Sequence, residues 1–270
     1  MFDYIKVDRE VAIEAAKRLV VDSIWKSANI ELVKGITFPE TQEIFEGRVP
    51  ANADVEKVIV VNNLKRSWQF LFENLDYPID VQLAAEYNRI IGEGGLYQNP
   101  GKLRDQIVRI SGTDYIPAMP SYESVKEQIS HALTIENPIE RGLELFALSS
   151  RGQWFNNGNK RTAQMLANHA FLQKNAAVFA IPDKHKERFT EELVNYYESN
   201  DSRNLHAFLY DTSVEMLPSG LTMKGLKEFE RASSDPFQEK LERAKKKVEE
   251  TISTVSQVNE QNVKDLEIER

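Results

Sequence analysis

Apolar residues recur at spacings of three and four along most of the chain, and this spacing predicts helices. Residues 8–33 carry the longest such pattern, with one shared apolar face formed by Val11, Ala15, Ala16, Leu19, Val20 and Ile24. The same spacing predicts a short helix that follows Pro39 and ends at Gly47, and further helices over 54–76 and 79–92. The first third of the chain is therefore predicted to be helical.

Residues 107–117 break this pattern. Ile107-Val108-Arg109-Ile110 leads through Ser111-Gly112-Thr113-Asp114 into Tyr115-Ile116-Pro117, a short β-branched run centred on a turn. Such a run predicts a small β-hairpin. Helical patterns then resume at about 121–134, from Pro138 onward, and at 162–173, 184–198 and 201–212. We predict an all-α fold that carries one small β-hairpin.

The end of the chain has a looser composition. Residues 217–234 contain proline, glycine and a Ser-Ser pair, and Asp235-Pro236 is a favourable helix start. From there the apolar positions step by four and three over about three heptads, and two of those positions are polar. This pattern favours a charged, solvated helix over about 235–262 that docks or dimerises weakly.

Composition narrows the class of protein. The chain has 270 residues, a net charge of -8, a pI near 5.3, 41% hydrophobic residues and no cysteine. This balance argues against a general nucleic-acid or anionic-membrane binder and excludes disulfides and thiolate chemistry. The N-terminus lacks the apolar run of a signal peptide, and no segment approaches the roughly 20 apolar residues of a membrane span. We expect a cytoplasmic protein without nucleic-acid or membrane partners.

The stretch GQWFNNGNKRTA, residues 152–163, is the candidate for chemistry. It precedes an almost continuously apolar helix, so Gly158-Asn159-Lys160-Arg161 stands where a helix N-terminus begins. Glycine allows a ligand to approach the backbone, the helix dipole favours an anion, and lysine and arginine supply permanent charge. Taken alone, Asn-Asn-Gly-Asn is also simply a turn that caps a buried helix.

The surrounding residues favour the first interpretation, because residues 153–164 resemble the motif H-x-F-x-[DE]-G-N-[GK]-R-x-x-[RA] of the Fic/Doc (Fido) family. That resemblance implies an all-helical core and a loop that binds nucleotide phosphates. The residues that it assigns to this loop are Phe155, Asn157, Gly158, Asn159, Lys160 and Arg161. It also implies ATP or another nucleotide as the ligand, and a target protein or a toxin/antitoxin-type partner.

Two further segments resemble the same family. The run around Arg109, Ile110, Ser111, Gly112 and Tyr115 is similar to its flap, which aligns a target segment beside the active site. Ser27-Ala28-Asn29-Ile30-Glu31 resembles the inhibitory (S/T)xxxE element of one class, although Leu32 replaces the usual Gly or Asn. The resemblance implies a helical extension over 1–60 that carries Ser27 and Glu31 as regulatory residues. It implies a core over 61–215, with a linker and charged helix over 216–270.

The motif differs from that of the family at the positions to which the resemblance assigns catalysis and magnesium binding. Gln153 occupies the position of the histidine that acts as general base, and an amide cannot accept that proton. Asn157 replaces the acidic residue that helps to hold Mg²⁺, so it is at best a weak magnesium ligand and we expect little or no Mg²⁺ requirement. The second motif arginine, the partner of the inhibitory glutamate, is Gln164. We therefore expect Glu31 to meet Lys160 or Arg161, or to act as a structural helix residue.

No histidine is placed to replace Gln153. His169 is expected to be a packed or hydrogen-bonded residue of a buried helix, and His185 and His206 fall in exposed helical patterns. No two histidines have metal-ligand spacing.

These residues support three hypotheses. The first is a Fic-fold pseudo-enzyme or regulatory partner that binds a nucleotide and is deficient in protein AMPylation. The second is an active transferase that modifies a target hydroxyl by a histidine-independent mechanism. The third is a non-enzymatic module that acts through the C-terminal helix, as a homodimer or with a partner.

Overall fold

The computed structural model describes residues 2–31, 35–51 and 54–233. The chain divides into two compact units, one that ends at Met223 and one that begins at Lys224. The predicted tail helix over 235–262 lies outside the described residues.

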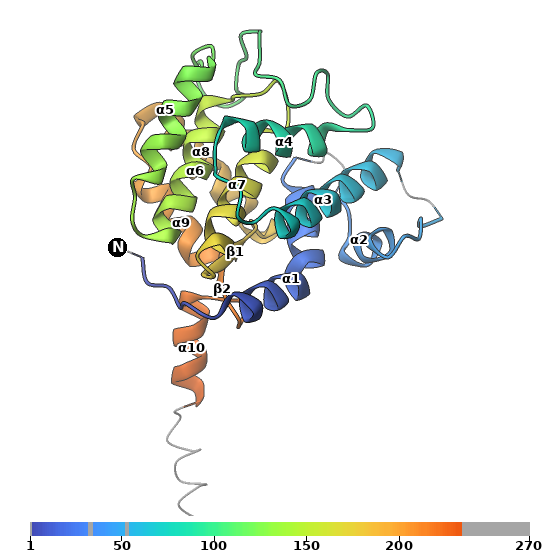
Figure 1. The fold of residues 1–270 in the computed structure, drawn as a ribbon, viewed down its shortest axis with the longest axis vertical. Helices are drawn as coiled ribbons and strands as arrows, with labels where there is room; N and C mark the ends of the chain where they lie inside the picture. The colour runs from blue at the N-terminus through green and yellow to red at the C-terminus, as the bar shows by residue number, and fades with distance from the viewer. Residues whose placement is uncertain (1, 32–34, 52–53, 234–270) are drawn as a thin grey trace, which may run out of the picture. The chain divides into compact units, whose positions relative to one another are not determined.

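The elements of the first unit are mostly helical (Figure 1). Its N-terminal helices are α1 (Arg9–Asn29), α2 (Phe38–Phe45), α3 (Val55–Glu73) and α4 (Val81–Gly92). After a long connection come α5 (Tyr122–Leu133), α6 (Pro138–Gly152), α7 (Asn159–Gln173), the single turn η1 (Asp183–His185), α8 (Lys186–Ser199) and α9 (Arg203–Thr212). The predicted all-α class is confirmed.

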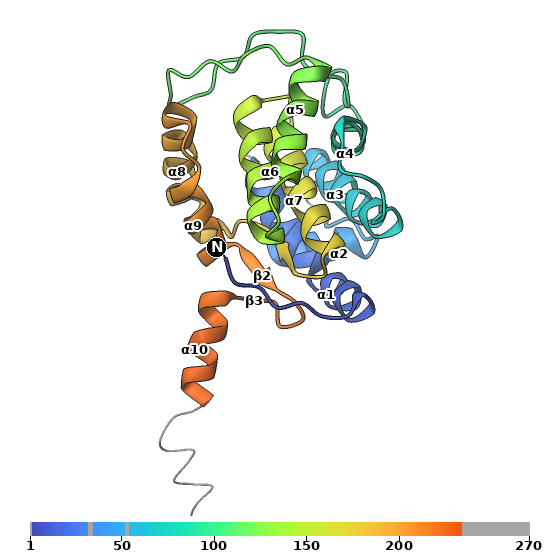
Figure 2. The ribbon, with the colours of Figure 1, turned by 60° about the vertical axis from the view of Figure 1, so that its left-hand side comes forward.

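Helix α7 is the centre of this unit. Every one of its residues from Asn159 to Leu172 except Lys160 is buried. In Figure 2, α6 and α7 stand between α8 and α9 on one side and α3 and α4 on the other. A Cβ on Gly142 of α6 would lie 2.2 Å from the ring of Phe171 on α7, so only glycine allows the two helices to approach this closely.

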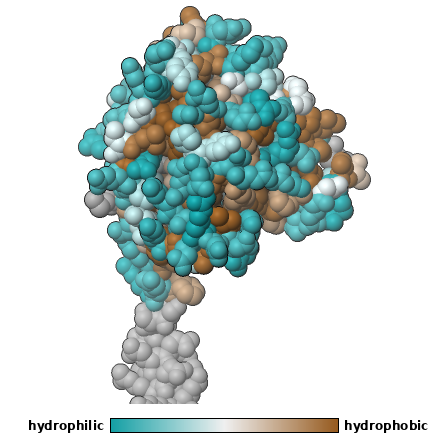
Figure 3. Space-filling model, viewed as in Figure 1, coloured by the Kyte–Doolittle hydropathy of each residue, from teal (hydrophilic) through white to brown (hydrophobic). Residues whose placement is uncertain are grey.

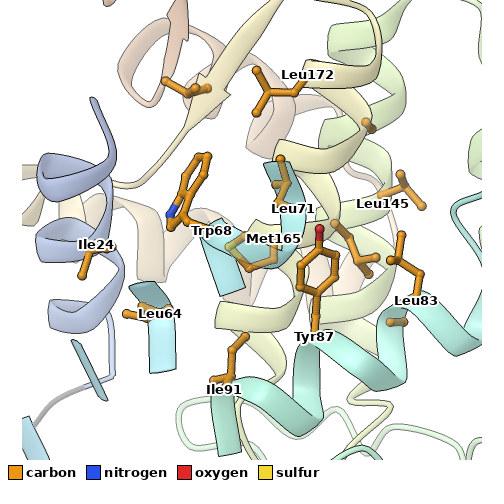
Figure 4. Packing of buried hydrophobic residues seen from close by; sticks show 14 of the residues in the cluster. Ile24, Leu64, Trp68, Leu71, Leu83, Tyr87, Ile91, Leu145, Met165 and Leu172 are labelled. Atoms are coloured by element: carbon orange, nitrogen blue, oxygen red, sulfur yellow. The ribbon is translucent and has the colours of Figure 1, made fainter. Parts of the chain in front are cut away.

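The hydrophobic core joins the N-terminal helices to α6 and α7. Trp68 of α3 and Tyr87 of α4 are among its largest fully buried side chains, and Met165 of α7 lies between them (Figure 4). Ile24 of α1 belongs to the same cluster. Since α1 contributes several core residues, the N-terminal helix is part of the packed unit.

The β-structure differs from the prediction. Residues 105–120, all of which are described, turn at Ser111-Gly112 but form no backbone ladder between their two arms. The sheet lies elsewhere, in β1 (Ala177–Phe179), β2 (Val214–Met216) and β3 (Leu221–Thr222), paired antiparallel in that order. These strands have two or three residues each, which is too short for an alternating pattern to be recognised.

The segment 217–234 was predicted to be loose, and that prediction is wrong for most of it. Leu221–Thr222 form β3, and α10 (Met223–Ser233) follows directly. Apolar and polar residues are interspersed on the surface seen in Figure 3. Among the helices of the described residues, none combines the length and apolar character that a membrane span requires.

Candidate functional site

The loop from Gln153 to Gly158 joins α6 to α7, and both of its ends are in the left-handed backbone region. Gln153 has φ 46° and ends α6, whereas Gly158 has φ 72° and begins α7. No side chain caps α7, and its first turn holds Lys160 and Arg161 without an acidic residue. The N–H groups of this turn therefore have no partner within the helix and are directed at whatever lies beyond it.

Asn159 fixes the shape of the loop from inside. Its side-chain oxygen accepts a hydrogen bond from the Phe155 N–H at 2.9 Å, and its amide donates to the Phe155 carbonyl at 2.8 Å. The same amide donates to Oε1 of Gln153 at 3.0 Å. Because Asn159 is only 5% exposed, these bonds are shielded from water. Its predicted role as a phosphate donor is replaced by an internal one in this arrangement.

Gln153 is held at both ends of its side chain. Its Nε2 donates to the carbonyl of Ser150 at 2.6 Å, while its Oε1 accepts from Asn159. Its backbone carbonyl accepts from Nε of Arg104 at 2.7 Å. A neutral amide lacks the basicity that proton abstraction needs, and these two hydrogen bonds hold the side chain in place.

Gly158 and Arg161 meet at Tyr97. A Cβ on Gly158 would lie 2.4 Å from the Tyr97 ring, so the ring packs directly against the glycine backbone. The Tyr97 hydroxyl accepts from Nη1 of Arg161 at 3.1 Å. Tyr97 could not be predicted as a site residue, because nothing in the pattern around residues 93–99 distinguishes it from an ordinary loop aromatic.

Arg161 is buried, and its other partners come from α1 and from the turn that follows α1. Nη2 donates to the Ala28 carbonyl at 3.2 Å, and Nε lies 3.5 Å from Oε2 of Glu31. Nζ of Lys160 lies 3.9 Å from the other oxygen of Glu31. The expectation that Glu31 meets Lys160 or Arg161 is confirmed, since it lies beside both.

The second regulatory candidate, Ser27, lies one turn earlier on α1. Its hydroxyl donates to Oε1 of Gln164 at 2.7 Å, which leaves the buried Nε2 of Gln164 without a hydrogen-bond partner. The glutamine at the second motif position is therefore bound to Ser27 and not to Glu31.

Arg104 connects the flap, residues 105–120, to the loop. This arginine is 2% exposed, and burial lowers the pKa of its guanidinium. Besides Gln153, it donates to the carbonyls of Gln106 at 2.7 Å and Pro117 at 2.9 Å, and also to that of Ala118. One side chain therefore holds both arms of the flap against the loop that carries Gln153.

A cavity of about 260 Å³ opens beside Gln153 and Lys160. Its cations are Lys160, Arg109 of the flap and Lys186 of α8, and no carboxylate is among the described residues that line it. Ile110, Ser111 and the side chains of Phe189, Thr190, Leu193, Val194 and Tyr197 form the rest of its wall. The Tyr197 hydroxyl is buried there without a hydrogen-bond partner, and burial raises its pKa. This cavity suits an anion attached to an apolar or aromatic body.

The remaining predicted residues lie around this cavity and do not line it. Phe155 is buried in the core and forms a bridge with Leu103, while Asn157 is exposed and accepts from Asn88 through its backbone carbonyl at 2.9 Å. Gly112 is exposed at the flap turn, and Tyr115 stacks on Tyr197 from the second arm. Among the described residues no group of three His, Asp or Glu side chains could hold a metal ion.

The histidines lie away from the loop. His169 is fully buried, pairs with the Tyr87 hydroxyl at 2.7 Å, and has its pKa lowered to about 4 by burial. That matches its predicted structural role. The prediction for His206 is wrong: it is 6% exposed and 3.3 Å from Glu144, with its pKa lowered to about 4 by burial. Its helix packs against α6, and the periodicity of α9 did not reveal which face does so.

Asn88 and Lys186 are two further site residues that the sequence pattern does not reveal. The Asn88 amide donates to the Asn157 carbonyl and to the Thr162 hydroxyl, and its oxygen accepts from the Gly101 N–H. Lys186 donates to the carbonyl of Asn29 at 2.7 Å and lines the cavity. Both are single residues on helices distant in sequence, so only the fold brings them to the site.

No family model and no curated protein matches the chain in sequence. Solved structures do match its fold. Fic-1 (aa134–508) from C. elegans superposes with a TM-score of 0.62 at 20% identity, over 73% of this chain and 62% of that chain. This chain thus spans less than two thirds of that protein fragment.

Two bacterial structures match in the same way. A Fic domain containing signaling protein from Bacteroides thetaiotaomicron has a TM-score of 0.56 at 16% identity, over 69% of this chain and 75% of that one. A Fic family protein from Desulfovibrio desulfuricans has a TM-score of 0.56 at 13% identity, over 74% of this chain and 69% of that one. The chain therefore has the Fic fold.

Proposed function

We propose that this protein is a nucleotide-binding pseudo-enzyme on the Fic fold, deficient in protein AMPylation and acting as a regulatory partner. The observation that carries the proposal is the state of Gln153. Its side chain is hydrogen-bonded to Ser150 and Asn159, so residue 153 serves the structure of the loop. Loss of a general base typically lowers a rate by ~10²–10⁴-fold.

Nucleotide binding is supported by charge. Three cations line one cavity, and one of them, Lys160, belongs to the uncapped first turn of α7. The rest of the lining holds apolar groups that suit a base or sugar. Asn157 supplies a neutral oxygen only, so ATP or another nucleotide is expected to bind with little dependence on Mg²⁺.

Glu31 is proposed to regulate this binding. Its carboxylate lies beside the buried Arg161 and beside Lys160, which lines the cavity, so a phosphate bound there must compete with Glu31 for Lys160. Glu31→Gln is expected to raise nucleotide affinity about tenfold, which corresponds to about 1.4 kcal/mol of binding free energy. Calorimetric titration with ATP, with and without Mg²⁺, measures this, and an unchanged affinity would argue against a regulatory Glu31.

Enzymatic deficiency is tested by labelling. The full chain is incubated with labelled ATP, GTP, CTP and UTP and with hydroxyl-bearing candidate proteins, beside an Arg161→Ala variant that lacks the buried arginine of the motif. We expect no labelling above the level of Arg161→Ala. Strong labelling that Arg161→Ala abolishes would overturn the proposal.

A gain-of-function variant sharpens the result. Gln153→His with Asn157→Asp restores the two charged functions that the resemblance assigns to the motif, while Asn159 and Arg104 keep the loop in shape. Labelling that appears only in this double variant identifies the missing groups as the cause of the deficiency. An activity already present in the native chain and merely enhanced would favour the histidine-independent transferase instead.

A further inference from the structure

A second cavity, of about 320 Å³, lies on the second arm of the flap. It is separate in its lining from the cavity at Lys160, because no residue is common to the two. Its walls come from five places: the flap at Tyr115 and Met119, α5 at Gln128, α6 at Arg151, the loop after α6 at Trp154, and α8 at Tyr196. It falls at the small end of the volumes that hold small-molecule ligands.

Arg151 is the only cation among the described residues that line this cavity, and no carboxylate lines it. Its guanidinium lies 4.1 Å from the ring centroid of Tyr115 and 5.9 Å from that of Tyr196. Nε and Nη2 donate to the carbonyl of Tyr197. No described carboxylate lies within ion-pair distance of it, so its positive charge is balanced by aromatic faces and one carbonyl alone.

The side-chain amides beside Arg151 offer hydrogen-bond donors. Oε1 of Gln128 already accepts from the Trp154 indole at 3.2 Å, which leaves the Nε2 amide of Gln128 to a ligand. Asn200 brings a second side-chain amide at the end of α8. The apolar surface between these groups comes from Met119, Leu148 and the aromatic rings. A ligand that complements this wall is planar, apolar over most of its surface and rich in acceptors at one end.

We propose that this cavity binds a small aromatic carboxylate. The ring lies among the tyrosines and Met119, and the carboxylate accepts from Nη1 of Arg151 and from the Gln128 amide. This site is additional to the nucleotide cavity and does not depend on it. A ligand in this cavity nevertheless contacts the loop, because Gly152 and Trp154, the neighbours of Gln153, form part of the cavity wall.

The test compares an acid with its amide. Calorimetric titration of the full chain uses 4-hydroxyphenylacetate and the neutral 4-hydroxyphenylacetamide, which share shape and ring. We expect the acid to bind at least about tenfold more tightly than the amide, a ratio that reports the charge-assisted bond. Equal affinities, or no heat from either compound at millimolar concentration, would overturn the proposal.

Variants locate the site. Arg151→Gln is expected to remove the preference for the acid, and Lys126→Gln, which deletes one charge at an exposed position of α5 outside the cavity, is expected to keep it. A preference that survives Arg151→Gln, or that disappears in Lys186→Gln at the other cavity, contradicts the assignment.

Two further variants keep the test decisive if Arg151→Gln loses its fold, as judged by circular dichroism. Arg151→Lys retains the charge and should keep a weakened preference for the acid. Ala118→Trp places a large ring at an exposed position of the cavity wall and should abolish binding of both compounds. Unchanged binding in Ala118→Trp would overturn the proposal by itself.

Discussion

Helices α6 and α7 lie against each other along their length, yet they begin in different ways. At the start of α6, the Asn137 oxygen accepts from the N–H groups of Ile139 and Glu140, Pro138 occupies the first turn, and Glu140 adds a negative charge. At the start of α7, Gly158 offers no side chain, and Lys160 and Arg161 add positive charge to the positive end of the helix dipole.

The two helix N-termini therefore have different properties. Helix α6 satisfies its own terminus, which stabilises it without any ligand. Helix α7 has an amide nearby, Asn159, but that side chain is turned back into the loop and leaves the terminus open. The α7 terminus is therefore poor as a helix start and suitable for an anion, and the buried packing of the rest of α7 compensates for it.

The largest expected effect comes from deleting the two asparagine side chains in turn. Asn159→Ala leaves the N–H and the carbonyl of Phe155 buried without partners, at about 1–3 kcal/mol for each group, or about 4 kcal/mol in total. Asn137→Ala removes an N-cap at about 1 kcal/mol. Urea unfolding of both variants measures the difference. Equal losses would mean that the Asn159 hydrogen bonds do not hold the loop.

A smaller effect is expected at the glycine that begins α7. Gly158→Ala forces alanine to φ 72° and drives its Cβ into Tyr97, with an expected loss of about 3 kcal/mol from backbone strain and overpacking together. Gly112→Ala at the flap turn is the matched control. Its φ is 85°, but its Cβ would lie no closer than 3.9 Å to Val194, so only the backbone strain of about 1–2 kcal/mol remains.

Denaturation midpoints of Gly158→Ala and Gly112→Ala give the two losses. A Gly158→Ala variant no less stable than Gly112→Ala would show that Tyr97 moves aside, and the close contact would then be unimportant for α7.

The smallest expected effect concerns the buried far half of α7. Folding lowers the pKa of His169 from 6.5 to about 4, so at pH values between 4 and 6.5 the unfolded chain binds this proton more tightly than the folded chain does. Stability from this group is full above pH 6.5 and is lost as the pH falls, by about 2 kcal/mol between pH 7 and pH 5. His169→Asn keeps an acceptor for the Tyr87 hydroxyl and should flatten this dependence.

Unfolding free energies of the native chain and His169→Asn at pH 7, 6 and 5 test this. On α6, burial raises the pKa of Glu144. Its contribution to stability changes with pH in the opposite direction to that of His169, because it is lost as the pH rises. A native chain and variant with parallel pH curves would show that His169 does not titrate differently in the folded and unfolded states.

The helices could be predicted from the sequence because their signals are local. Apolar periodicity located α1, α3, α4 and α8 within a few residues, and the turn residues before Lys160 located the start of α7 three residues late. The pairing of β1 with β2 could not be predicted, because it joins three-residue segments 37 positions apart, from Ala177↔Met216 to Phe179↔Val214. Neither segment is long enough to carry a strand pattern of its own.

The candidate site likewise contains residues that the sequence predicts and residues that only the fold reveals. The loop and the Glu31 contact followed from motif positions, whereas Tyr97, Asn88 and Lys186 are placed by tertiary structure alone. Asn159 was predicted to face a phosphate because its residue type permits it. Its side chain turns inward because the buried N–H and carbonyl of Phe155 have no other partner, which outweighs a contact with a solvated ligand.

The hydrogen bonds that Arg104 donates to backbone carbonyls have a consequence for residue 153. Since the guanidinium grips backbone carbonyls, including that of Gln153, it is indifferent to the side chain at that position. This link between the flap and the loop is thus kept whichever residue stands at 153, whereas the hydrogen bonds of the Gln153 side chain to Ser150 and Asn159 depend on the residue type. The hydrogen bonds from Arg104 that join the flap to the loop therefore place no constraint of their own on the side chain at position 153.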